Sequence, residues 1–124
     1  MKALIVDDSK VMVRIISNTV EMLGMDVEKV HNGQDAIDLL KKQPDEFSII
    51  LMDWNMPVMN GYETLLAIKE DPALSHIPVM MVTTEGEQSN VIKALKAGAD
   101  GYLTKPFNQQ DLAVKIMETL GMGI

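Results

Sequence analysis

Ile49-Ile50-Leu51-Met52-Asp53 is a run of four apolar residues that ends at an acid. The run is short and has no polar residue inside it, which indicates a β-strand covered by protein on both faces. Ala3-Leu4-Ile5-Val6 has the same form and ends at Asp7-Asp8. Strands of this kind are typical of a parallel sheet with helices on both sides, so the two stretches predict an α/β protein.

Similar apolar runs alternate with segments of helical period along the whole chain. The expected strands span residues 3–6, 27–30, 49–52, 79–82 and 102–104. The expected helices span residues 9–23, 33–43, 60–70, 89–97 and 108–120, and in the first of them residues 12, 15, 16, 19 and 23 are expected to face the core. Because strand–helix–strand crossovers are right-handed, the simplest topology is a doubly wound five-stranded parallel sheet. The strand order 2-1-3-4-5 is one of the two common solutions for such a sheet, and it is the order that we expect.

The length and composition limit the classes of protein to which this chain can belong. Its 124 residues fit one domain, spanning residues 1–124. The absence of cysteine excludes disulfide scaffolds, thiolate metal sites and cysteine catalysis. The 11 basic and 18 acidic side chains give a formal net charge of −7, which argues against binding of nucleic acid through its phosphates. No apolar run approaches the roughly 20 residues of a membrane helix, so we expect a cytoplasmic protein.

Polar side chains stand at the ends of four of the five expected strands. The first strand is followed by Asp7 and Asp8, the third by Asp53, the fourth by Thr83 and the fifth by Lys105. Because parallel strands end at one edge of the sheet, we expect these side chains to gather there, where ligands bind in open α/β sheets. Three neighbouring carboxylates need a cation, and carboxylate oxygens with a main-chain carbonyl and water suit Mg²⁺. The sequence therefore predicts a magnesium site at Asp7, Asp8 and Asp53.

The same constellation favours chemistry on a phosphoryl group. Mg²⁺, a lysine and a hydroxyl together stabilise a phosphoryl group during its transfer. Carboxylates form aspartyl phosphates, so Asp53, at the end of the central strand, is the best candidate nucleophile in a chain without cysteine. Taken singly, each acid is more often a turn former or a helix cap, and Thr83 and Lys105 also fit an ordinary strand end and a solvated surface. Their joint placement at four strand ends favours the functional interpretation.

Several short motifs occur in the order and at the spacing of a known family. They are Val6-Asp7-Asp8-Ser9, Met52-Asp53-Trp54-Asn55-Met56-Pro57, Asn60-Gly61, Val82-Thr83-Thr84, Gly98-Ala99-Asp100-Gly101-Tyr102 and Lys105-Pro106-Phe107. On these residues the chain resembles the receiver domain of two-component response regulators over essentially its whole length, and within that family the stand-alone chemotaxis type. The resemblance implies a flavodoxin-like (βα)5 fold without an output domain.

The resemblance also implies a role for each acid at the strand ends. Asp53 is expected to accept a phosphoryl group from a phosphohistidine of a histidine kinase. Asp7, Asp8 and Asp53 are expected to hold Mg²⁺ together with the main-chain carbonyl of Asn55, and Lys105 is expected to pair with a phosphoryl oxygen. The protein is then no general enzyme, because it catalyses only its own phosphorylation and dephosphorylation.

Thr83 and Tyr102 match the two positions that form the switch of this family. The resemblance implies that Thr83 donates a hydrogen bond to the phosphoryl group and that the Tyr102 ring then rotates inward. The output face expected from the family comprises residues 89–97, 102 and 108–120. Asn55, Thr84 and Glu85 lie at positions that tune the rate of dephosphorylation, and Thr84 is larger than the alanine that most members have there.

The expected partners follow from the same resemblance. A histidine kinase is the phosphodonor, a flagellar motor switch component is the downstream protein, and a phosphatase is a further partner. The chain is expected to be a monomer that binds no nucleic acid and does not insert into membranes. A phosphorelay intermediate, or a phosphate sink that competes for the same kinase, stays an alternative.

Two other classes of protein share parts of this pattern. An aspartate-nucleophile phosphatase of the haloacid dehalogenase type has a strand-end acid, but it needs an acid/base residue two positions later, where this chain has Asn55. A flavodoxin-type electron carrier needs a phosphate-binding loop after the first strand, where Asp7 and Asp8 would repel the phosphate. Both classes therefore fit the sequence less well than a receiver.

Three residues near the strand ends carry expectations of their own. Trp54 directly follows Asp53 and is expected at the rim of the site. His31 ends the outermost strand and is expected to lie away from the other strand-end groups. The Lys105–Pro106 peptide bond is expected to be trans, the commoner isomer.

Overall fold

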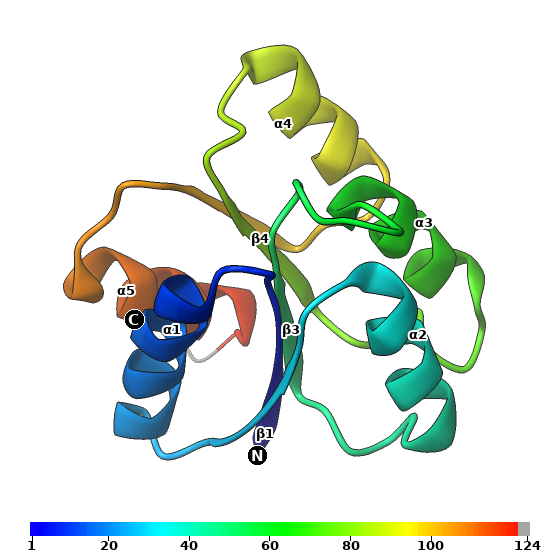
Figure 1. Ribbon diagram of the computed structural model, residues 1–124, viewed down its shortest axis with the longest axis horizontal. Coiled ribbons are helices and arrows are strands. Elements are labelled where there is room, and N and C mark those ends of the chain that lie inside the picture. Colours follow the sequence, from blue (N-terminus) through cyan, green and yellow to red (C-terminus); the bar gives the residue numbers. More distant parts are fainter. Residues whose placement is uncertain (122–124) are drawn as a thin grey trace.

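The computed structural model describes residues 1–121, in which five strands alternate with five helices (Figure 1). The strands are β1 (Lys2–Val6), β2 (Asp26–Val30), β3 (Ile49–Met52), β4 (Val79–Thr83) and β5 (Gly101–Thr104). The helices are α1 (Lys10–Met22), α2 (Gly33–Lys42), α3 (Gly61–Glu70), α4 (Gln88–Lys96) and α5 (Gln109–Thr119). These bounds agree with the ones expected from the sequence to within one residue.

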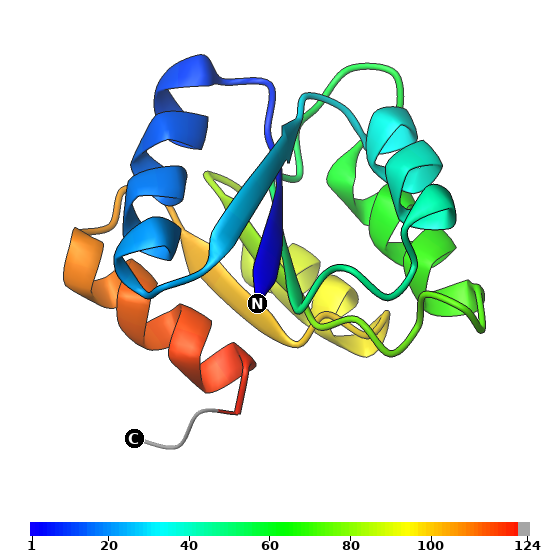
Figure 2. The same ribbon diagram turned by 90° about the horizontal axis from the view of Figure 1, so that it is seen from below.

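The five strands form one parallel sheet with the order β2-β1-β3-β4-β5, as predicted. Helices α1 and α5 cover one face, and α2, α3 and α4 cover the other (Figures 1 and 2). The doubly wound, flavodoxin-like fold expected from the sequence is thereby confirmed. Every strand ends at the same edge of the sheet, and this edge carries the residues of interest.

The core is divided into two clusters by the sheet. Along β1, Leu4 and Val6 pack toward α2, α3 and α4, whereas Ala3 and Ile5 pack toward α1 and α5. All four side chains are inaccessible to solvent. Full burial of each larger one stabilises the fold by roughly 1.5–3 kcal/mol. The continuous apolar runs are therefore explained by strands that are buried on both faces.

The predicted core-facing side of α1 is wrong in part. Ile16 and Thr19 are buried as expected, but Ile15 is 42% exposed. The other buried residues of α1 are Val13, Ser17 and Val20. Positions 13, 16, 17 and 20 form an i, i+3, i+4, i+7 stripe that faces the sheet and α5. Met12 and Leu23 are partly buried and also pack against this cluster, so Ile15 is the one expected residue that faces solvent. The sequence carries two overlapping apolar stripes, and tertiary packing selects between them.

Polar caps fix the starts of the helices. Ser9, Asn32, Asn60 and Asn108 each accept a hydrogen bond from the main-chain N–H three residues later. At α3 the cap is reciprocal, because the carboxylate of Glu63 also accepts from the N–H of Asn60 at 3.0 Å. This capping box, predicted from the sequence, fixes the point at which the chain leaves the site edge and enters α3.

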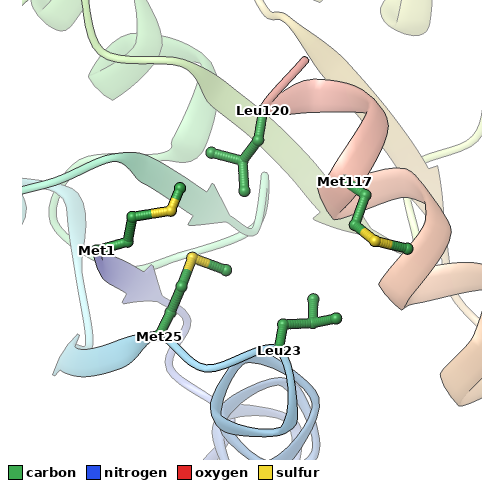
Figure 3. Close-up of a pocket in the computed structure, with 5 residues that line it drawn as sticks. All are labelled: Met1, Leu23, Met25, Met117 and Leu120. Carbon is green, nitrogen blue, oxygen red and sulfur yellow. The ribbon is translucent and has the colours of Figure 1, made fainter. Parts of the chain in front are cut away.

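A small apolar pocket of about 100 Å³ (Figure 3) lies at the edge of the sheet where β1 and β2 begin, because two of its residues, Met1 and Met25, directly precede these strands. It is lined by Met1, Leu23, Met25, Met117 and Leu120. Methionine side chains adapt to irregular gaps, so this composition is that of a loosely filled extension of the core. No helix within residues 1–121 combines the length and apolar character that a membrane crossing requires.

Candidate functional site

The β1–β3 ladder brings two acids together at the edge of the sheet. Its last pair is Val6 with Met52, so the next residues, Asp7 and Asp53, are neighbours. The main-chain N–H of Asp53 donates a hydrogen bond to the carbonyl of Val6 at 3.0 Å, which extends the ladder by one step. The position of each carboxylate is therefore set by strand pairing rather than by a flexible loop.

Asp7, Asp8 and Asp53 form an acidic cluster. Each presents a carboxylate oxygen, and these three oxygens lie within 4.8 Å of one another. Asp7 and Asp53 are buried, with 1% and 8% of their surface exposed, whereas Asp8 faces solvent. Two unit charges about 4 Å apart repel by about 4 kcal/mol at an effective dielectric constant near 20. The cluster is therefore costly without a cation.

One oxygen of Asp53 is left without a hydrogen bond. Oδ1 is buried, and it has no partner within the part of the chain that the structure describes. A buried polar atom without a partner costs free energy, so a bound cation or a covalently attached group at this oxygen would relieve that cost. Carboxylate oxygens of this number and exposure fit Mg²⁺, which takes a few protein oxygens and keeps several waters.

Lys105 bridges the two buried acids from the end of β5. Its Nζ lies 3.1 Å from Oδ2 of Asp7 and 3.6 Å from Oδ2 of Asp53. Its main-chain N–H donates to the carbonyl of Thr83 at 2.8 Å, which anchors it to the end of β4. The Lys105–Pro106 bond is cis, so the expectation of a trans bond is wrong. That expectation rested on isomer frequency alone, and the tertiary amide before proline makes the intrinsic preference small enough for packing to override.

The environment of Asp7 perturbs its ionisation. Burial raises the pKa of the Asp7 carboxyl above its ordinary value, although the N–H of Ser9, at 2.9 Å from Oδ1, and the Lys105 ammonium oppose the shift. Ser9 caps α1 with its hydroxyl, which accepts from the N–H of Met12 at 3.3 Å. Ser9, and not Asp7, is therefore the N-cap of α1, although an acid after a strand is often a helix cap.

The loop from β3 to α3 packs closely against the main chain of Asp53. A Cβ at Gly61 would lie 2.0 Å from the carbonyl oxygen of Asp53, so only glycine fits there. The N–H of Gly61 donates to the carbonyl of Trp54 at 2.7 Å. Asn55 is exposed in this loop, and Val58 has a φ of 69°, a left-handed conformation that is rare for a β-branched residue.

Thr83 and Tyr102 are connected through Glu85. Thr83 is fully buried at the end of β4, and its Oγ1 accepts a hydrogen bond from the N–H of Glu85 at 3.2 Å. The Tyr102 hydroxyl donates to the carbonyl of the same residue. Burial, reinforced by the negative charges of Glu85 and Asp53, raises the pKa of Tyr102 to about 12. Thr84 is exposed beside these residues.

Three groups close to the site were not expected there from the sequence. His31 was expected to lie away from the site, but its Nδ1 lies 3.1 Å from the carbonyl oxygen of Asp7. β2 is outermost in the sheet but borders β1, so its end meets the end of β1. Trp54 is half-buried at the rim, as expected, and stacks on Tyr62, whose ring centroid lies 4.4 Å from Nζ of Lys93. No sequence signal marks Tyr62 or Lys93, because their contacts arise only from tertiary packing.

Comparison with known proteins places this geometry in context. Residues 3–117 match the family model described as response regulator receiver domain. The chain is 46% identical over 124 residues to a chemotaxis protein CheY homolog of Campylobacter jejuni, which covers 99% of this chain and 95% of that protein. It is 43% identical over 122 residues to chemotaxis protein CheY1 of Helicobacter pylori, with 98% of each chain covered.

Solved structures show the same similarity. Chemotaxis protein CheY4 of Vibrio cholerae superposes with a TM-score of 0.86 at 33% identity, covering 95% of this chain and 97% of that one. A response regulator receiver domain protein of Clostridium thermocellum superposes with a TM-score of 0.87 at 27% identity, covering 98% of this chain and 94% of that one. The strand order and the helical layers are thus shared with these proteins.

Proposed function

This chain belongs to the response regulator receiver domain family, and we propose that it accepts a phosphoryl group on Asp53 from a phosphohistidine of a histidine kinase in a Mg²⁺-dependent reaction. The observation that carries the proposal is the Oδ1 atom of Asp53, which is buried and unpartnered among the described residues while Oδ2 faces Lys105 at 3.6 Å. One oxygen is thus available for a new bond, and the other lies within ion-pair distance of Lys105.

The residues that would hold Mg²⁺ are Asp7, Asp8 and Asp53, with the main-chain carbonyl of Asn55 as a further oxygen ligand. Bound there, Mg²⁺ supplies positive charge that offsets the phosphoryl oxygens and the carboxylates. Asp7 is held by two hydrogen bonds, from Ser9 and Lys105, so its orientation does not depend on the cation. Asp8 is exposed and free to adjust.

The transfer forms a bond from Oδ1 of Asp53 to phosphorus while the bond from phosphorus to the imidazole nitrogen of the donor breaks. The electron pair of the broken bond stays with the imidazole, and the product is an aspartyl phosphate. Lys105 would neutralise a phosphoryl oxygen, and the buried hydroxyl of Thr83 would donate a hydrogen bond to another. Strand ends fix the main chain of both residues, so the hydrogen bond from Thr83 needs only a rotation of its side chain.

The proposed switch starts at Thr83 and ends on the face formed by residues 89–97, 102 and 108–120. A Thr83 hydroxyl that turns toward a phosphoryl group leaves the N–H of Glu85, and Glu85 also accepts the hydrogen bond of Tyr102. The two orientations of Tyr102 would then present different surfaces to a partner. Asn55, Thr84 and Glu85 border the site, where they would tune the lifetime of the phosphoryl group.

The named relatives favour chemotaxis as the pathway. The proteins from Campylobacter jejuni and Helicobacter pylori are chemotaxis proteins by name, so we infer that the downstream partner is a component of a flagellar motor switch and that a phosphatase resets the signal. A phosphorelay intermediate or a phosphate sink uses the same chemistry without a switch target. A general phosphatase fits less well, because the side-chain amide of Asn55 does not ionise and so cannot act as a general acid.

Acetyl phosphate, a small phosphodonor, tests the acceptor directly. Incubation with Mg²⁺ is expected to give one phosphoryl adduct, detected by intact mass, which disappears in Asp53→Asn or after chelation. The matched control is Asp45→Asn, an exposed acid in the loop before β3, which is expected to be phosphorylated like the wild type. An adduct that persists in Asp53→Asn, or rapid turnover of many phosphoesters, would contradict the proposal.

Partner capture distinguishes a switch from a sink. The protein is incubated with a cell extract with and without a stable phosphoryl mimic such as beryllofluoride. Recovery of a flagellar switch component only with the mimic supports the switch. Equal recovery of every partner in both states argues for a relay or sink instead.

A further inference from the structure

A row of three side chains connects the β3–α3 loop, α3 and α4. Trp54 contacts Tyr62, and Tyr62 contacts Lys93. The rings of Trp54 and Tyr62 are stacked, with their centroids 5.3 Å apart and their planes 14° from parallel. The ammonium of Lys93, on α4, lies 4.4 Å from the centroid of the Tyr62 ring, on α3. Stacked rings prefer this separation, and a cation over a tyrosine face is attracted by the ring quadrupole. The row therefore links α4 to the residue that follows Asp53.

The Trp54 end of this row is rigidly joined to the acceptor. The N–H of Gly61 donates to the carbonyl of Trp54 at 2.7 Å, and Gly61 lies against the main chain of Asp53 with no space for a side chain. Tyr62 directly follows Gly61, so its ring is carried by the same close contact. A displacement of the Tyr62 ring is thus transmitted to the loop that contains Trp54 and Asn55.

The Lys93 end of the row belongs to a weakly held helix. Within α4, all of whose residues the structure describes, Ala94 alone is buried. Its N-cap, Glu87, makes no side-chain hydrogen bond to the first turn within the described chain. Because α4 buries only Ala94 among its residues, the contact from Lys93 to Tyr62 is a further attachment of this helix to α3.

We propose that Lys93 and Tyr62 are positioning residues that hold Trp54, and with it the β3–α3 loop, in the arrangement that binds the cation at Asp53. The inference rests on the proposed Mg²⁺ site. A loosened stack leaves the loop less ordered, so cation binding then carries an additional entropic cost. Because coupling between two sites is reciprocal, a partner that draws Lys93 off the ring lowers the affinity for Mg²⁺, and Mg²⁺ favours the docked position of α4.

The chain contains a single tryptophan, so tryptophan fluorescence reports the surroundings of Trp54 alone. Lys93→Met keeps an unbranched side chain, shorter by one atom, and removes its charge. We expect greater quenching of Trp54 by acrylamide without any cation, and a dissociation constant for Mg²⁺ that is about two- to fivefold higher, as loss of an exposed cation–π contact would give. Mg²⁺ binding is measured by the amide chemical shifts of Asp7 and Thr83, which do not depend on the tryptophan signal.

Conservative variants separate positioning from general effects on the fold. Lys93→Arg retains a cation and is expected to restore wild-type quenching and affinity, and Tyr62→Phe is expected to do the same because it keeps the ring. Tyr62→Leu removes the ring and is expected to weaken Mg²⁺ binding at least as much as Lys93→Met. Adding Lys93→Met to Tyr62→Leu is expected to weaken it no further, because both changes break one connection.

Lys96→Met is the matched control, since it removes a positive charge from an exposed position of the same helix. It is expected to leave both readouts unchanged. Equal effects of Lys96→Met and Lys93→Met, or equal effects of Lys93→Arg and Lys93→Met, would overturn the inference. If the wild type binds Mg²⁺ and Lys93→Met binds it with unchanged affinity, the inference is overturned but the proposed function is not. A wild type that binds no Mg²⁺ would overturn both.

Discussion

The ammonium nitrogen of Lys105 lies 3.1 Å from Oδ2 of Asp7, although 98 positions separate the two residues in the chain. This pair is almost closed to solvent, with 12% and 1% of the two side chains exposed. Even so, burial outweighs the lysine and raises the pKa of the Asp7 carboxyl. The folded protein therefore holds a proton on Asp7 more tightly than the unfolded chain does, and ionisation of Asp7 at neutral pH destabilises the cation-free fold.

Asp7→Asn is consequently expected to stabilise the protein when Mg²⁺ is absent. Because the raised pKa means that burial disfavours the charged carboxylate, removal of this charge is expected to increase the free energy of unfolding. The advantage is present at neutral pH and shrinks as the pH falls toward the pKa of Asp7, where the wild type also becomes neutral. Urea denaturation with and without Mg²⁺ measures both effects.

The same titrations contain their own control. Mg²⁺ is expected to stabilise the wild type and Asp45→Asn, which changes an exposed acid, but not Asp7→Asn. A loss of stability in cation-free Asp7→Asn would show that the ion pair with Lys105, and not the burial of charge, dominates this position.

Gly61→Ala is expected to destabilise the protein by about 1–3 kcal/mol, the usual cost of overpacking. The added methyl group would lie 2.0 Å from the carbonyl oxygen of Asp53 and 2.8 Å from Cα of Trp54, and both atoms belong to the main chain of the site. Gly86→Ala serves as the control, because its nearest neighbour is a flexible methyl group of Thr104 at 3.2 Å. Thermal unfolding of the two variants compares them, and equal stability would show that the loop moves freely away from the sheet.

The fold was predictable because the apolar runs in the sequence match strands of a parallel sheet that is buried on both faces. The four apolar residues before Asp53 specify a strand buried on both faces, and the acid that follows marks the edge at which it ends. The proximity of Asp7 and Asp53 was predictable because parallel strands end at the same edge of the sheet. Lys105 was placed at the same edge by the same reasoning, without knowledge of any distance.

The contacts that were missed have causes that a sequence does not encode locally. The exposure of Ile15 depends on which of two apolar stripes of α1 meets α5, and the contact of His31 with Asp7 depends on β2 lying beside β1. Tyr62 and Lys93 meet only because α3 and α4 are adjacent on one face of the sheet. Each of these facts belongs to the assembled helices and strands rather than to a motif.

Val58→Asn is expected to stabilise the protein by about 1 kcal/mol, because it relieves left-handed strain. Val58 has a φ of 69°, a region that costs a non-glycine residue roughly 1–2 kcal/mol and that asparagine tolerates better. Its side chain is 82% exposed, so little packing is lost. Thermal unfolding should show a rise of a few degrees, whereas Val11→Asn, at a helical position that is 70% exposed, should show none. A decrease in Val58→Asn would mean that the valine contacts stabilise the loop despite its conformation.

Tyr102 is expected to make stability depend on pH in the alkaline range. Its pKa is raised to about 12 from an ordinary value of 10.0, first by burial and then by the negative charges of Glu85 and Asp53. Between these two values the unfolded chain loses the phenolic proton while the folded protein keeps it, so the stability that Tyr102 contributes is complete below pH 10 and is lost as the pH rises toward about 12. The slope from this one group reaches about 1.4 kcal/mol per pH unit at most.

Tyr102→Phe removes the titrating group together with the hydrogen bond to the carbonyl of Glu85. The variant is expected to be less stable by about 1 kcal/mol at neutral pH, and this deficit should shrink through the alkaline window because the wild type alone has a Tyr102 proton to lose. Urea denaturation at a series of alkaline pH values gives the two slopes. Tyr62→Phe retains Tyr102 and should follow the steeper wild-type course, whereas parallel courses for the wild type and Tyr102→Phe would mean that the Tyr102 hydroxyl is solvated in the folded protein.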